Sequence, residues 1–323
     1  MSDIKTIGVL TSGGDAPGMN AAVRAVVRAA IYYGMNVKGI MHGYNGLIQD
    51  NVIDMDLRSV SNIIQRGGTM LFTARCKEFT TEEGQQKAYE TCVKHGIDAL
   101  VVVGGDGSFR GCQAMARKGI KCIGIPGTID NDISCSDYTI GFDTALNTSL
   151  QMIDRLRDTA RSHERCSVVE VMGRHAGYIA VSTAIANGAM AVIIPEREFD
   201  IQKDVIEKIM ESQKIGKKNF LVVVAEGVGD AAGMAKIIQY ATGIETRATI
   251  LGHVQRGGSP SARDRLLASL MGCKAVELLK DGEYNRVVAL KEYQIVSYDI
   301  EEALAMKKSI DPYFLHVADI VSI

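Results

Sequence analysis

Short apolar runs rich in Val and Ile recur along the chain and alternate with segments of helical periodicity. A continuous apolar run of four to eight residues is typical of a strand buried on both faces of a parallel sheet. The predicted strands are Thr6–Leu10, Val37–Met41, Ala99–Val103, Cys122–Ile125, Ser167–Val171, Ala191–Ile194, Phe220–Ala225 and Arg286–Leu290. Strands that alternate with helices in this way predict a doubly wound α/β fold.

The sequence indicates where the helix after the first strand begins and ends. Pro17 suits a first-turn position, and Gly34 suits a carboxyl-terminal stop. Arg24 and Arg28 stand four residues apart on its polar face, where like charges repel mildly. Either water screens this pair or an anion lies between the two side chains. The apolar stripe of the helix consists of Ala22, Val23, Val26, Val27, Ala30 and Ile31.

The composition limits the possible number of domains, the kinds of partner and the chemistry of the cysteines. A chain of 323 residues with 46% hydrophobic residues is long enough for two ordinary domains, although no Pro- or Ser-rich linker marks a boundary. A net charge of −2 does not favour a nucleic acid or an anionic membrane as partner. The seven cysteines are scattered and never spaced C-x-x-C, which indicates buried, reduced thiols and not a disulfide framework or a zinc site. The start of the chain shows no signal-like apolar segment, so we expect a cytoplasmic protein.

Two predicted strands run into glycine-rich turns that precede helices. The turns are T-S-G-G-D at 11–15 and G-G-D-G-S at 104–108, and both should open at the carboxyl edge of the sheet. Glycines let the backbone approach a phosphate chain, and the following helix directs its amino end at the charge. Asp106 could hold a metal ion, or it could simply cap the helix. Neither turn matches the P-loop or the dinucleotide fingerprint, which weakens both of those interpretations.

The segment P-G-T-I-D-N-D at 126–132 follows another predicted strand. It places Asp130 and Asp132 two residues apart on a turn, with the hydroxyl of Thr128 nearby. Phosphoryl transfer to an alcohol needs one carboxylate to accept the hydroxyl proton and another near the metal. A local Asx-turn formed by Asn131 and Asp132 is an equally good interpretation of the same residues.

Arginines recur at turn positions where a phosphate could be bound. Each can make forked, charge-assisted contacts with phosphate oxygens, but any single arginine taken alone is more often a solvated or salt-bridged surface residue. His253 and Glu226 likewise have structural explanations. The candidate arginines are Arg75, Arg165, Arg174, Arg247 and Arg256.

Taken together, these segments resemble the bacterial ATP-dependent 6-phosphofructokinases from end to end. The matching motifs are G-V-L-T-S-G-G-D-A-P-G-M-N-A-A at 8–22, G-G-D-G-S at 104–108, P-G-T-I-D-N-D at 126–132, M-G-R at 172–174 and L-G-H-V-Q-R-G-G-S-P at 251–260. The resemblance implies transfer of the γ-phosphoryl group of ATP to the 1-hydroxyl of fructose 6-phosphate, a step of glycolysis that requires Mg²⁺. It also implies two α/β domains with the active site in the cleft between them.

The resemblance implies a role for individual residues. Asp106 would bind Mg²⁺, Asp130 would be the catalytic base, Thr128 and Asp132 would position substrate and metal, and Arg174 would stabilise the transferring group. The implied ATP site consists of Gly14, Arg75, Cys76, Gly105, Asp106, Gly107 and Ser108. The implied sugar-phosphate site consists of Thr128, Ile129, Asp130, Arg165, Met172, Gly173, Arg174, Glu226, Arg247, His253, Val254, Gln255 and Arg256.

Domain limits and assembly are also implied by the resemblance. An ATP-binding domain would comprise residues 1–142 and 257–305, and a fructose-6-phosphate-binding domain would comprise 143–256 and 306–323. The family's homotetramer shares its active sites, because the positions matching Arg165 and Arg247 reach across from a neighbouring subunit.

Two glycines bear on the choice of phosphoryl donor. Pyrophosphate-dependent relatives usually carry Asp at the position of Gly107 and Lys at that of Gly127, where the side chains would crowd the nucleotide's α-phosphate. Glycine at both positions therefore favours ATP. The remaining alternatives are a pyrophosphate-dependent kinase and a non-catalytic nucleotide or sugar-phosphate sensor on the same fold.

Regulation is where the sequence departs from the family. Arg24, Arg28, Arg157, Lys217 and Lys218 match the site that binds ADP or phosphoenolpyruvate. The family's Arg, Glu, Arg and His are replaced there by Leu57, Met190, Ile215 and Asn219. Loss of these charged groups predicts weak or altered control by either effector.

Overall fold

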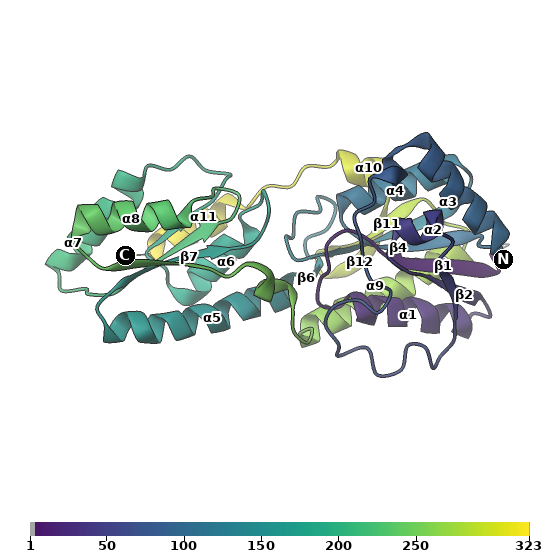
Figure 1. Ribbon diagram of the computed structural model, residues 1–323, viewed down its shortest axis with the longest axis horizontal. Coiled ribbons are helices and arrows are strands. Elements are labelled where there is room, and N and C mark those ends of the chain that lie inside the picture. The colour runs from purple at the N-terminus through teal and green to yellow at the C-terminus, as the bar shows by residue number, and fades with distance from the viewer. Residues whose placement is uncertain (1–3, 323) are drawn as a thin grey trace. The chain divides into compact units, whose positions relative to one another are not determined.

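The computed structural model describes residues 4–322 (Figure 1). By its contacts the chain divides into two compact units. Unit 1 consists of Met1–Ile129, Ile133–Thr144 and Arg256–Lys308, and unit 2 consists of Asp130–Asp132, Ala145–Gln255 and Ser309–Ile323. The chain therefore passes from one unit to the other several times.

Unit 1 is built on a mostly parallel sheet with the strand order β12-β11-β5-β4-β1-β2-β3, and β6 pairs with β5 beside this path. Only β3 and β12, the two edge strands, run antiparallel to their neighbours. The strands are β1 (Thr6–Thr11), β2 (Asn36–Ile40), β3 (Val52–Met55), β4 (Ala99–Gly104), β5 (Lys121–Thr128), β6 (Ile140–Gly141), β11 (Arg286–Lys291) and β12 (Gln294–Asp299).

Helices cover both faces of this sheet. Figure 1 shows α1 and α9 side by side on one face and α2, α3 and α4 on the other. The core on the second face joins Leu10 and Val102 of the sheet to Phe109 and Met115 of α4. The helices of unit 1 are α1 (Met19–Tyr32), α2 (Tyr44–Ile48), α3 (Glu82–Lys94), α4 (Asp106–Arg117), α9 (Ala262–Lys280) and α10 (Ile300–Ala305), with a 3₁₀ turn η1 (Glu78–Thr80).

Unit 2 has a smaller parallel sheet with the order β10-β7-β9-β8. Its strands are β7 (Cys166–Val171), β8 (Ala191–Ile193), β9 (Phe220–Ala225) and β10 (Thr246–Ile250). Its helices are α5 (Phe142–Ser162), α6 (Tyr178–Asn187), α7 (Lys208–Lys214), α8 (Ala231–Thr242) and α11 (Pro312–Ile320), with a π-helical segment η2 (Gln202–Glu207) and a 3₁₀ turn η3 (Gly252–Arg256). The first three residues of α5 belong to unit 1, so this helix continues from one unit into the other.

The predicted doubly wound α/β fold is confirmed, and every predicted strand is present. The apolar pattern missed β3, β6, β10 and β12, because these strands are short or only partly buried and carry no continuous apolar run. The expected helix start was also wrong by two residues. Helix α1 begins at Met19, because Gly18 has a positive φ of 106° and ends the turn that contains Pro17.

The cysteine prediction needs one correction. Among the described residues all cysteines are free, and five are buried as expected, but Cys273 is exposed and Cys76 is half-buried. Burial raises the pKa of the Cys92 thiol to about 12, which suppresses its reactive thiolate form. Within residues 4–322, no helix is long and apolar enough to cross a membrane.

Candidate active site

The two glycine-rich turns lie side by side at one edge of the unit 1 sheet, as predicted. Strands β1 and β4 are parallel neighbours with Thr11 opposite Val103, and the amide of Ser12 donates to the carbonyl of Val103 at 2.9 Å. The hydroxyl of Ser108 donates to the carbonyl of Ser12 at 3.3 Å. A side chain at Gly104 would overlap both Ser108 and Ser12, so the two turns can approach only because this residue is glycine.

Helix α4 presents its amino end at the same edge. Gly105 is the N-cap and has no side chain, while Asp106 is the first helical residue. Gly105, and not Asp106, therefore occupies the N-cap position. The hydroxyl of Tyr44 donates to the carbonyl of Ser108 at 2.7 Å and so helps to fix this first turn. A helix start with a glycine at the N-cap position suits a phosphate, because the backbone amides of a helix start and the helix dipole both favour negative charge.

The two glycines that bear on the phosphoryl donor differ in their surroundings. A Cβ atom added at Gly107 would meet no atom within 4 Å, whereas one at Gly127 would lie 2.9 Å from Val103 and 3.3 Å from Met19. Gly127 therefore has a packing reason to be glycine whatever the donor is. Gly107 has no such reason, so it is the more informative of the two.

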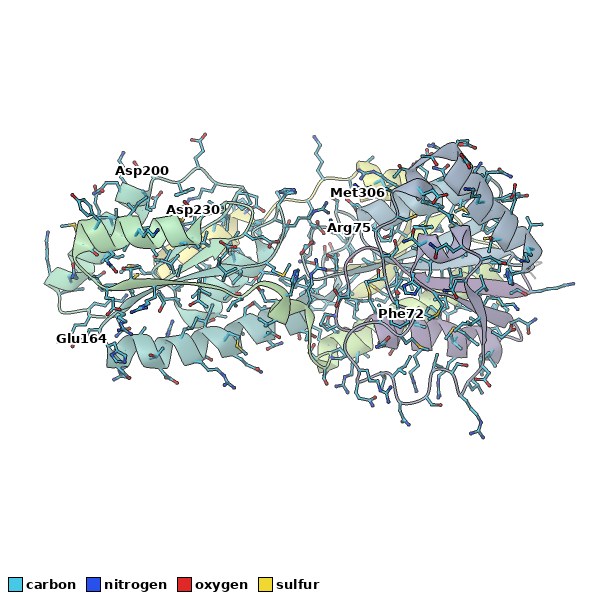
Figure 2. The ribbon with its side chains drawn as sticks, in the orientation of Figure 1. Phe72, Arg75, Glu164, Asp200, Asp230 and Met306 are labelled. Atoms are coloured by element: carbon cyan, nitrogen blue, oxygen red, sulfur yellow. The ribbon has the colours of Figure 1, made fainter. Side chains whose placement is uncertain are left out.

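Arg75 and Cys76 lie in the long loop between β3 and η1, where Figure 2 marks Arg75. Two hydroxyls hold this loop against the first glycine-rich turn. Thr11 Oγ1 donates to the carbonyl of Phe72 at 2.7 Å, and Thr73 Oγ1 donates to the carbonyl of Gly13 at 2.8 Å. Arg75 is exposed and Cys76 packs against the core, so the loop offers one charged and one apolar group near the turn.

The fit of a magnesium ion can be judged from the donor set. Residues 4–322 contain no group of three or more His, Cys, Asp or Glu side chains arranged to hold a metal. Asp106 alone stands at the amino end of α4. Mg²⁺ typically keeps several waters and binds one or two carboxylates together with the phosphates of its nucleotide. A single carboxylate beside a phosphate-binding helix start fits that mode.

The segment with the candidate base follows the end of β5. Thr128 is the last residue of the strand, and Thr139 Oγ1 donates to its carbonyl at 2.7 Å. Asp130 is 8% exposed and Asn131 is 5% exposed, and Asn131 adopts a left-handed conformation with φ of 53°. Neither Asp130 nor Asp132 is without an interaction partner. The chain changes unit directly after Ile129, so this turn also forms one of the crossings.

Glu226 shapes the M-G-R turn of unit 2. Its Oε1 atom accepts hydrogen bonds from the amides of Gly173 at 3.2 Å and Arg174 at 2.6 Å. Arg174 has a φ of 58°, which is unusual for a residue with a long side chain. Glu226 therefore stabilises a backbone conformation that leaves the Arg174 guanidinium exposed.

Gln255 is a fully buried residue of η3. Its Oε1 accepts from the amide of Met172 at 2.8 Å, and its Nε2 donates to Ser149 Oγ at 2.8 Å. Both ends of the amide are thus occupied by protein groups, so Gln255 fixes the position of Met172 from within unit 2. The neighbouring His253 and Val254 are exposed.

Arg165 and Arg247 are brought together by Glu245, a residue that the sequence did not single out. Glu245 Oε2 accepts from Arg165 Nε at 2.7 Å, and Oε1 accepts from Arg247 at 2.6 Å and 3.0 Å. These hydrogen bonds, first that of Arg165 and then that of Arg247, lower the pKa of the Glu245 carboxyl. Glu245 lies in no motif, and although Arg247 is two residues away, its other partner Arg165 lies 80 residues away in the sequence.

Arg256 lies against the first glycine-rich turn of unit 1. Its Nη1 is 3.5 Å from Asp15 Oδ1, and a Cβ atom at Gly14 would overlap its guanidinium group. Its Nε is buried without a hydrogen-bond partner among the described residues. A residue assigned to the sugar phosphate thus contacts the turn assigned to ATP, which the sequence did not predict.

The residues matched to an effector site have mixed surroundings. Burial and then the positive charge of Arg28 lower the pKa of Arg24. Lys218 pairs with Glu164 at the end of α5, which Figure 2 labels, at 2.7 Å. Met190 is 2% exposed and belongs to the unit 2 core, while Ile215 is 87% exposed. Neither residue offers a charged group to a phosphate.

A mostly parallel sheet with two neighbouring glycine-rich turns at its carboxyl edge, together with a second, parallel sheet, places this chain among the two-unit α/β proteins. A family model described as phosphofructokinase matches residues 6–279. The chain belongs to the phosphofructokinase family. It is 57% identical over 319 residues to an ATP-dependent 6-phosphofructokinase of Clostridium acetobutylicum, covering 99% of this chain and 100% of the relative. One from Clostridium botulinum is 56% identical with the same coverage.

Solved structures agree with this assignment. A phosphofructokinase from Saccharomyces cerevisiae superimposes with a TM-score of 0.88 at 37% identity, covering 99% of this chain and 48% of the yeast chain. The chain thus spans about half the length of that relative. A pyrophosphate-dependent phosphofructokinase from Marinobacter aquaeolei gives a TM-score of 0.83 at 24% identity, covering 96% of this chain and 86% of that one. At that identity the likeness shows only that the fold is shared.

Proposed function

We propose that this chain is an ATP-dependent 6-phosphofructokinase, which converts fructose 6-phosphate and MgATP to fructose 1,6-bisphosphate and ADP. The observation that carries the proposal is the full-length identity of 56% to relatives of that name, over 99% of the chain. The exposed, unobstructed position of Gly107 supports the choice of ATP over pyrophosphate.

The donor would be held by unit 1. The amino end of α4, with Gly105, Gly107 and Ser108, would receive the phosphate chain, and Gly14 would allow its close approach. Arg75 would reach the phosphates from its loop, and Cys76 would line the nucleotide site. Asp106 would hold Mg²⁺, which when bound neutralises charge on the phosphate oxygens.

The acceptor would be activated by the segment after β5. Asp130 would take the proton of the sugar 1-hydroxyl, and Thr128, Ile129 and Asp132 would position the substrate and the donor's phosphates. Arg174 would stabilise negative charge on the transferring group. Little covalent chemistry is required of the protein, so catalysis would come from alignment and charge stabilisation.

The sugar phosphate would be held by the basic groups of the second half of the chain. Arg165, Arg247, His253 and Arg256 would bind the 6-phosphate, and Met172 and Glu226 would contact the sugar. The backbone bonds that Glu226 makes to Gly173 and Arg174 leave it a positioning role as well. Gln255 and Val254 would likewise help to position the residues of the sugar-phosphate site.

Assembly and domain roles complete the proposal. Unit 1 would be the ATP-binding domain and unit 2 the fructose-6-phosphate-binding domain. A homotetramer would let Arg165 and Arg247 serve the active site of a neighbouring subunit. Both residues are at least partly exposed in the single chain, which supports such a role. We also expect the enzyme to act in the cytoplasm.

A donor test decides between the proposal and its alternatives. Fructose 1,6-bisphosphate formation should be measured with Mg²⁺ and with either ATP or pyrophosphate as the only donor. Turnover with ATP alone is expected. Turnover with pyrophosphate would identify the alternative kinase, and binding of both ligands without turnover would identify a sensor on this fold.

A further inference from the structure

A carboxylate outside the proposed substrate sites is fully buried at the start of helix α9. Asp264 is 0% exposed. Its Oδ1 accepts from the amide of Gly141 at 2.9 Å, and its Oδ2 accepts from the amide of Thr144 at 2.8 Å and from Thr144 Oγ1 at 2.5 Å. Burying a carboxylate costs folding free energy unless its oxygens accept hydrogen bonds, as they do here. These hydrogen bonds fix the orientation of the Asp264 side chain.

These contacts bind backbone amides at the start of helix α5. The helix begins at Phe142, directly after Gly141, and glycine has no side chain to accept from the first free amides. Asp264 performs this role from another helix, 120 residues further along the chain. Burial raises the pKa of Asp264, and the hydrogen bonds from Thr144 and Gly141 oppose that rise.

The same contacts lead to the candidate catalytic turn. Gly141 belongs to β6, which pairs with the end of β5 so that Gly141 stands opposite Thr128. Thr139, at the start of the same short segment, donates from its Oγ1 to the carbonyl of Thr128. Asp264 therefore fixes β6, the strand that pairs with Thr128 at the end of β5. Thr128 lies two residues before Asp130.

Asp264 also secures one of the chain's crossings. Thr144 is the last residue of this stretch that belongs to unit 1, and α5 continues from there into unit 2. The amide of Ser261 donates to Thr144 Oγ1 at 2.9 Å, and Ser261 Oγ in turn accepts from the amide of Asp264 at 3.2 Å. The start of α9 and the start of α5 are thus bound into one hydrogen-bonded cluster.

We propose that Asp264 is a positioning residue for phosphoryl transfer, which acts through Gly141 and Thr144 on the turn that carries Thr128 and Asp130. The inference rests on the proposed function of that turn. Asp264 itself touches no substrate. It sets the place of the candidate base relative to the strand end, and a displacement of about 1 Å in such a group can cost about 10²-fold in rate.

The test compares Asp264→Asn with Asp98→Asn. Asp98 also accepts two backbone hydrogen bonds in unit 1, from Lys5 at 2.8 Å and Thr6 at 2.9 Å, but at the amino end of β1. In Asp264→Asn an amide N–H₂ or a weaker acceptor meets the donors of Gly141 and Thr144. We expect its kcat to fall about 10- to 10²-fold with both KM values within about twofold, whereas Asp98→Asn keeps its kcat. An equal kcat in the two variants at equal loss of thermal stability would overturn the proposal.

A second pair of variants guards against misfolding. Thr144→Val removes the hydroxyl that donates to Asp264, and Thr144→Ser retains it. The expected order of kcat is wild type, Thr144→Ser, Thr144→Val, and finally Asp264→Asn. Rates for the two Thr144 variants that do not differ would contradict the proposal.

Hydrogen exchange provides a readout that does not depend on the reaction. The amides of residues 127–132 should exchange about tenfold faster in Asp264→Asn than in wild type, and their exchange should be unchanged in Asp98→Asn. Unchanged exchange in Asp264→Asn would refute the positioning role. A wild-type protein without turnover on fructose 6-phosphate would refute the proposed function instead, so the two failures can be told apart.

Discussion

The glycine-rich turns of unit 1 and the arginine set of unit 2 are positioned by different physical means. The turns sit at the ends of β1 and β4, strands that are almost wholly buried, and backbone hydrogen bonds and close packing fix them. Arg165 and Arg247 are held by one exposed carboxylate, that of Glu245. Exposed ion pairs contribute little to the free energy of folding, and salt screens them. The donor side is therefore expected to be rigid and the phosphate-binding arginines to be adjustable.

The largest effect should come from the candidate base. Asp130→Ser removes the group that would accept the sugar proton, so kcat should fall by about 10²–10⁴-fold while substrate affinities persist. Steady-state kinetics with calorimetric binding of both substrates would check this. Asp137→Ser is the matched control, because Asp137 pairs with Lys291 on the surface of unit 1. Near-normal turnover of Asp130→Ser would refute the assignment of the base.

The next largest effect tests the rigid donor side. Gly107→Asp places a negative charge in the open space beside the first turn of α4, where it would repel the nucleotide's phosphates. We expect kcat/KM for ATP to fall by about 10- to 10²-fold, which matches the loss of one charge-assisted interaction. Gly107→Ala is the control, since its Cβ meets no atom within 4 Å. If the alanine variant loses as much activity as the aspartate variant, volume rather than charge is responsible.

A smaller effect is expected on the adjustable side. Glu245→Gln leaves two like charges side by side, so the arginines should separate and KM for fructose 6-phosphate should rise about two- to fivefold. The value of kcat and KM for ATP should stay unchanged. Asp319→Asn, which breaks the exposed pair with Arg197, serves as control in the same unit. A rise in KM for ATP of equal size would show that the effect is not confined to the phosphate-binding arginines.

The pH dependence of this pairing has a definite sign. Arg165 and Arg247 lower the pKa of Glu245 in the folded protein. The contribution of this carboxylate to the stability of the folded protein is therefore complete above the usual glutamate pKa of about 4.5. It is lost as the pH falls through the lower pKa that Glu245 has in the folded protein. A ¹³C NMR titration of the Glu245 carboxyl should therefore show a midpoint below that of an exposed glutamate. A midpoint at or above the usual value would mean that the arginines are not paired with it in solution.

The smallest response is expected at the effector-matched positions. Ile215 and Leu57 offer no charge to a phosphate, and Met190 is buried in the core of unit 2. Saturation curves for fructose 6-phosphate should shift less than about twofold when ADP or phosphoenolpyruvate is added, because the forked contacts of the two arginines replaced by Leu57 and Ile215 are lost. A strong, cooperative shift would show that Arg24, Arg28 and the lysines suffice for control.

The sequence predicted some parts of the molecule and could not predict others. Buried strands and both glycine-rich turns were visible because each depends on a local pattern, an apolar run or a cluster of glycines. The roles of Glu245 and Asp264 were not visible, because each binds a residue that is distant in the sequence and neither lies in a recognisable motif. The contact of Asp15 with Arg256 was not visible either, because the two residues are 241 positions apart, although Asp15 belongs to the first glycine-rich turn. Edge strands such as β12 were missed because half-burial leaves no continuous apolar run.

The repeated crossing of the chain between its two units has a consequence for biosynthesis. Residues 145–255 contain all the strands of the unit 2 sheet and emerge as one uninterrupted stretch. Unit 1 lacks α9 and β11 until much later, so the apolar face of α1 that α9 covers stays open while the intervening stretch is made. Unit 1, whose first segment is translated first, is thus completed only when residues 256–308 have been made. During synthesis on the ribosome the nascent chain would carry an unfinished amino-terminal sheet, an aggregation-prone state that chaperones would have to shield.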